Sequence, residues 1–133
     1  MMKPVAKNIL VGLLLATVTI ALHMSLSESR RLELTSFLLV LIGSVYYGFA
    51  LLSKHKEVIV IEVIVASVFV AMGVFGLWFS PWILITGLFL HGLWDIAHHN
   101  ASVKLAKIPS WYIPFCAAYD WTMAIYVSLI MLN

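Results

Sequence analysis

Side chains able to bind a metal ion stand within three of the apolar segments of this sequence. They are Glu62 in segment 58–79, His91, Asp95, His98 and His99 in segment 81–100, and Cys116 and Asp120 in segment 113–132. At about 100° per residue, His91, Asp95 and His98 fall on one helical stripe. Cys116 and Asp120 are four residues apart and share a face of another helix. Imidazole and carboxylate ligands suit zinc or iron, and a thiolate from Cys116 would favour zinc.

The elements that must position these groups are apolar segments of about 20 residues, the length that crosses a bilayer as a helix. We expect transmembrane helices over residues 8–26, 34–53, 58–79, 81–100 and 113–132. The composition, 63% hydrophobic and 11% charged, excludes an ordinary soluble domain. The first segment is long enough to span and no A-x-A cleavage site follows it, so we expect a retained helix. The sequence therefore predicts an all-α integral membrane protein with a single five-helix domain over residues 1–133.

The basic residues predict how this bundle is oriented. With a cytoplasmic N-terminus, six lysines lie inside, namely Lys3, Lys7, Lys54, Lys56, Lys104 and Lys107. Only Arg30 and Arg31 then lie outside, which agrees with the excess of basic residues in cytoplasmic loops. Five spans place the C-terminus outside. The expected partners are the lipid bilayer and a lipid or other hydrophobic substrate, and no nucleic acid.

This orientation brings the polar side chains to similar depth in the cytoplasmic half of the bundle. Glu62 lies about one turn into its helix and Asp120 about two turns into its own, while His98 and His99 lie at a cytoplasmic helix end. Ionisable groups inside a bilayer are costly and commonly functional. We expect metal ligands among His91, Asp95, His98 or His99, Cys116 and Asp120. The remaining carboxylate, Glu62 or Asp120, would act as a general base toward metal-activated water.

Three functions are consistent with such a set of residues. The first is a small metal-dependent membrane enzyme, hydrolytic in type, that acts on a lipid or another hydrophobic molecule. The second is a proton or metal-ion transporter that uses the same groups as a relay. A relay should continue across the membrane, yet only His23 and uncharged tyrosines lie beyond the cluster, which favours the enzyme. The third is an accessory subunit in which the polar groups are structural, with Cys116 simply a small buried residue.

The motif H-x-x-W-D-x-x-H-H, from His91 to His99, is followed by C-A-x-x-D, from Cys116 to Asp120. Together these motifs resemble a family of small uncharacterised bacterial membrane proteins, a domain of unknown function. The resemblance covers roughly residues 87–127. The connection between the two motifs contains Lys104 and Lys107 in place of a Gly/Pro-rich stretch. The resemblance implies a bacterial inner (plasma) membrane location and transfers no activity.

Small residues at helical spacing predict close packing between helices. The two pairs are Gly12-x-x-x-Ala16 and Ser44-x-x-x-Gly48. Such pairs let helix backbones approach each other in lipid. We expect both to pack within the chain rather than against a second copy.

Overall fold

The described part of the chain is entirely helical between its connections. The computed structural model describes residues 2–99 and 104–132. It contains five helices: α1 Pro4–Met24, α2 Glu28–Leu51, α3 Lys56–Trp78, α4 Pro81–Ala97 and α5 Tyr112–Leu132. Within those residues no strand is present. The predicted all-α bundle is therefore confirmed.

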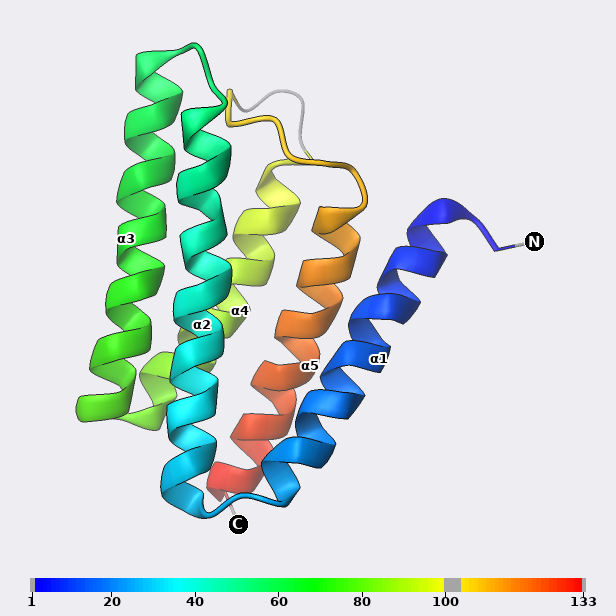
Figure 1. The fold of residues 1–133 in the computed structure, drawn as a ribbon, viewed down its shortest axis with the longest axis vertical. Helices are drawn as coiled ribbons and strands as arrows, with labels where there is room; N and C mark the ends of the chain where they lie inside the picture. The colour runs from blue at the N-terminus through cyan, green and yellow to red at the C-terminus, as the bar shows by residue number, and fades with distance from the viewer. Residues whose placement is uncertain (1, 100–103, 133) are drawn as a thin grey trace.

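Successive helices run in opposite directions, up and down along the long axis of the molecule (Figure 1). The N-terminus, the α2–α3 connection and the described part of the α4–α5 connection lie at one end. The α1–α2 and α3–α4 connections and the C-terminal end of α5 lie at the other end. All six lysines therefore gather at the end that carries the N-terminus, and both arginines lie at the opposite end. The predicted cytoplasmic N-terminus agrees with this separation and remains a prediction.

Four helices, α1, α2, α3 and α5, are long and apolar enough to cross a membrane. The surface of α1 shows the character of a lipid-facing helix, because Leu14 is 57% and Val18 66% exposed. α4 has 17 residues and is therefore about 25 Å long, a little less than the hydrocarbon core of a bilayer. It packs against α2, α3 and α5.

The first two helices begin earlier than the hydropathy of the sequence indicated. α1 starts at Pro4, because proline suits the first turn of a helix, where its missing N–H costs nothing. α2 starts at Glu28, whose charge is favourable at a helix N-terminus. The arginines consequently lie in a helix rather than in a loop. Arg31 Nε donates to the carbonyls of His23 and Leu26, at 2.9 and 3.0 Å, and so caps the C-terminal end of α1.

The fourth helix ends at Ala97, earlier than the predicted end at Asn100, which lies outside the described residues. The backbone N–H of His98 turns back to the carbonyl of Asp95, at 3.2 Å. The ring nitrogen Nδ1 of His98 also donates a hydrogen bond to the Trp94 carbonyl oxygen, at 2.8 Å. This side-chain bond uses an acceptor of the last helical turn, which helps to end the helix there.

One of the two small-residue pairs packs as expected. Gly12 and Ala16 are buried, and a Cβ on Gly12 would clash with the carbonyl oxygen of Phe115 on α5. Only glycine permits this close approach of α1 to α5. The expectation for Ser44-x-x-x-Gly48 is wrong at Gly48, because a Cβ there would meet nothing within 4 Å. Gly48 instead lies on the exposed side of α2.

Candidate metal centre

Four possible metal ligands meet where α4 packs against α5. They are His91 and Asp95 from α4, and Cys116 and Asp120 from α5. One ligand atom from each lies within 4.8 Å of the others, and all four side chains are buried. Each helix supplies its pair at i and i+4, so both residues of a pair project from one face toward the neighbouring helix. The group could hold a metal ion.

The separations between donor atoms are close to those of a tetrahedral site. His91 Nδ1 lies 2.7 Å from Asp120 Oδ2, 3.7 Å from Asp95 Oδ2 and 4.0 Å from Cys116 Sγ. Zinc bonds of about 2.0–2.3 Å in tetrahedral geometry place ligand atoms roughly 3.3–3.8 Å apart. The contact between His91 and Asp120, a hydrogen bond in this structure, must lengthen, and the widest separations in the group, up to 4.8 Å, must shorten. A bound ion would therefore require small side-chain movements.

Some polar atoms of the four-donor group are buried without a hydrogen-bond partner. Of six such side-chain atoms among the described residues, three belong to this group: His91 Nε2, Asp95 Oδ2 and Asp120 Oδ1. Buried polar atoms are nearly always satisfied, so each of these atoms calls for an explanation such as an ion or a water. Asp95 Oδ2 faces the His91 ring nitrogen that is also closest to Asp120. The residues present therefore fit a divalent cation.

Two tyrosines support the donors from outside the group. The Tyr46 hydroxyl on α2 donates a hydrogen bond to Asp95 Oδ1. The Tyr112 hydroxyl on α5 lies 3.5 Å from Cys116 Sγ. Outer partners of this kind orient ligands and tune their affinity for a metal. Neither role follows from the spacing of the sequence, although a buried tyrosine in an apolar helix usually needs a partner for its hydroxyl.

A second polar group lies at the neighbouring turn, outside the four-donor group. His98 Nε2 contacts Glu62 Oε1 at 2.7 Å, and the backbone N–H of Ala106 donates to the same oxygen at 2.9 Å. The Trp94 carbonyl can only accept a hydrogen bond, so His98 Nδ1 carries a proton. The other ring nitrogen, Nε2, makes the contact with Glu62. We call His98 and Glu62 the outer pair.

The Tyr46 ring connects the outer pair with the four-donor group. Its centroid lies 5.4 Å from that of His91 and 5.1 Å from that of His98. Its hydroxyl reaches Asp95 between them. The two groups are therefore separate but adjacent along α4.

The structure brings together some of the residues singled out from the sequence and separates others. His91, Asp95, Cys116 and Asp120 converge, whereas His98 and Glu62 form the outer pair. His99 is exposed just after α4 and joins neither group. At the opposite end of the bundle, His23 lies 2.9 Å from the Thr35 hydroxyl and packs edge-on against Tyr126.

The chain was compared with known protein families, curated proteins and solved structures. The model of a family of unknown function, DUF6010, matches residues 7–131. The chain belongs to this family. No curated protein and no solved structure matches it. The matched residues 7–131 contain the four donors, the outer pair and both supporting tyrosines.

Proposed function

We propose that this DUF6010 chain is a small metal-dependent hydrolytic enzyme of the bacterial inner membrane that acts on a lipid or another hydrophobic molecule. The observation that carries the proposal is the convergence of four buried donors on a site with unpartnered carboxylate oxygens. A donor set of imidazole, carboxylate and thiol suits zinc or iron. Intramembrane ionisable groups are costly and are retained mainly for function.

Charge balance favours three ligands over four. Two carboxylates, Asp95 and Asp120, neutralise a divalent cation, and a neutral His91 completes the set. A thiolate from Cys116 would leave a net negative charge in the apolar interior, which is unfavourable. We therefore expect Cys116 to remain a thiol beside Asp120, 3.7 Å from its Oδ2. Three protein ligands with an open fourth position are typical of catalytic rather than structural zinc sites.

The outer pair supplies the acid–base chemistry in this proposal. A bound divalent ion would supply Lewis-acid activation of water next to Asp95. With Asp120 serving as a ligand, Glu62 is the carboxylate left to accept the proton of water, at Oε2, while His98 would orient it through Oε1. The water oxygen would bond to the carbonyl or phosphoryl centre of the substrate. As the ester bond breaks, the proton held by the outer pair would pass to the leaving alcohol.

A transmembrane relay is less well supported. Buried apolar side chains, among them Leu39, Leu88 and Met123, occupy the core between the four donors and the His23 end of the bundle. Proton or ion transfer along side chains needs a continuous series of polar groups. Among the described residues, the buried ionisable side chains next to the four donors, His98 and Glu62, lie toward the end with the lysines.

Isotopically labelled water provides the test. Metal-loaded protein, reconstituted in bacterial lipid extract, should introduce the labelled oxygen into a lipid product detected by mass spectrometry. Asp120→Asn should abolish this, and Tyr47→Phe should not, because the Tyr47 hydroxyl contacts only the exposed Ser67 among the described contacts. Bound metal without label incorporation would instead make the centre a structural link between α4 and α5.

A further inference from the structure

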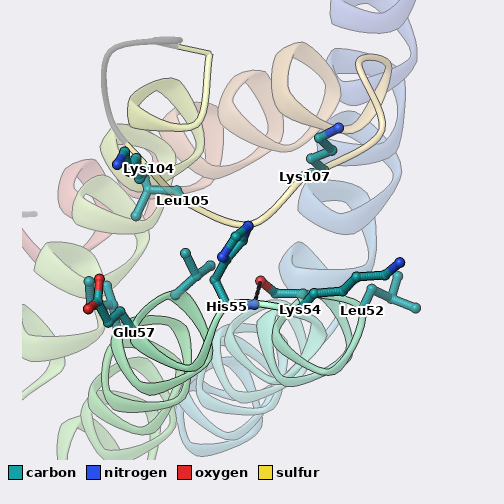
Figure 2. Close-up of a pocket in the computed structure, with 10 residues that line it drawn as sticks. Leu52, Lys54, His55, Glu57, Lys104, Leu105 and Lys107 are labelled. Carbon is teal, nitrogen blue, oxygen red and sulfur yellow. Dashed lines mark hydrogen bonds between the residues drawn. The ribbon is translucent and has the colours of Figure 1, made fainter.

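A basic pocket of about 820 Å³ lies at the end of the bundle that carries the lysines. It opens between the α2–α3 connection and the segment 104–107 (Figure 2). Figure 2 shows Lys104 and Lys107 on either side of His55, with Lys54 on the α2–α3 connection and Glu57 at the start of α3. Its volume is within the range of small-molecule sites.

The lining of this pocket is both cationic and apolar. Three lysines line it against one acid, Glu57, so the pocket has an excess of positive charge. Apolar side chains complete the wall: Leu52, Val58, Ile61 and Leu105. A ligand that satisfies both parts carries an anionic group and a hydrocarbon portion. Basic pockets of this kind between helices on the cytoplasmic side recognise lipid head groups.

We propose that this pocket binds a lipid with an anionic phosphate head group, with the phosphate near Lys104 and Lys107 and the first acyl carbons against Leu105 and Val58. The site is independent of the metal centre, because it shares no residue with the four donors. The pocket adjoins the outer pair. Two of its lining residues, Ile61 and Leu105, directly precede Glu62 and Ala106, and the backbone N–H of Ala106 donates a hydrogen bond to Glu62.

The lysines of the pocket must be distinguished from general attraction between basic loops and anionic membranes. Lys3 and Lys7 offer the comparison. They lie at the same end of the bundle and are exposed, yet neither lines the pocket. If the pocket is a specific binding site, removing two lysines from the pocket should weaken lipid binding more than removing Lys3 and Lys7.

The experiment measures binding of dihexanoyl phosphatidic acid to the full-length protein in a neutral detergent, by titration calorimetry. The variants are K104Q/K107Q and the control K3Q/K7Q, with the metal content of each determined in parallel. Dihexanoyl phosphatidylcholine and inorganic phosphate serve as comparison ligands. We expect the wild type to bind phosphatidic acid at least about tenfold more tightly than phosphatidylcholine or inorganic phosphate. We expect K104Q/K107Q to bind phosphatidic acid about tenfold more weakly, or weaker still, than the wild type. We expect K3Q/K7Q to change the affinity less than about twofold.

Three results would overturn the proposal. Equal weakening by K3Q/K7Q would mean general surface attraction. Inorganic phosphate bound as tightly as phosphatidic acid would make free phosphate the ligand, and phosphatidylcholine bound as tightly would remove the role of charge. An unchanged midpoint of thermal unfolding in K104Q/K107Q would show that the variant is folded.

Discussion

The Tyr46 hydroxyl offers a sharp test of how the four-donor group binds metal. Tyr46→Phe removes only the oxygen that donates to Asp95 Oδ1 and leaves the ring against His91 and His98. Asp95 is fully buried, so water cannot replace the lost donor without rearrangement. A hydrogen bond to a charged group contributes about 1.5–3 kcal/mol. Because metal binding needs Asp95 ionised, we expect zinc affinity to fall about tenfold to a hundredfold, as for other outer partners of metal ligands.

The assay is competition with a chromophoric zinc chelator, using purified protein in detergent. Tyr47→Phe is the matched control, because it removes a hydroxyl from the next residue of α2, whose partner is the exposed Ser67 at 2.8 Å. Thermal melting of both variants without metal would show that they remain folded. Equal zinc affinity in the Tyr46 and Tyr47 variants would refute the view that Tyr46 orients a metal-binding Asp95.

Three further predictions test the charge balance, the packing and the topology. The Cys116→Ser variant should keep its bound metal, because the Cys116 thiol is not a ligand in the proposed site. Loss of the metal from this variant would show that Cys116 is a ligand. Gly12→Leu should lower stability by about 1–3 kcal/mol in thermal or denaturant unfolding, since it forces α1 away from α5. The control Gly48→Leu has open space and should be tolerated. A reporter fused after Asn133 should lie outside the cytoplasm and one inserted at 54–57 inside, and a cytoplasmic C-terminus would contradict the predicted orientation.

The helices could be predicted from the sequence because hydropathy and length alone define them in a membrane protein. Helix ends were less accessible, because they depend on local contacts rather than on hydropathy. α2 extends back to Glu28 through a charged turn, and there Arg31 binds carbonyls of the preceding helix. α4 ends early at Ala97, and the ring of the next residue, His98, contacts the Trp94 carbonyl and Glu62.

Helical spacing predicts which residues of α4 and of α5 share a face, but it does not predict that these two faces meet. The i and i+4 positions of His91 with Asp95, and of Cys116 with Asp120, define two faces, and helix packing then decides which faces meet. The helix face could not separate His98 from His91, since both lie on one stripe. The separation arises because His98 lies about two turns further along the helix, where it contacts Glu62 of the neighbouring α3. The role of Tyr46 needed the position of α2, which no local pattern supplies.

The metal content of the purified full-length protein tests the central claim most directly. Elemental analysis of the wild type should find about one equivalent of zinc or iron, and Asp120→Asn should retain less than about a tenth of that. Asparagine keeps the size of the side chain, so the variant should still insert and fold. Wild-type protein that carries no metal and gains none on titration with zinc or iron would contradict the metal centre.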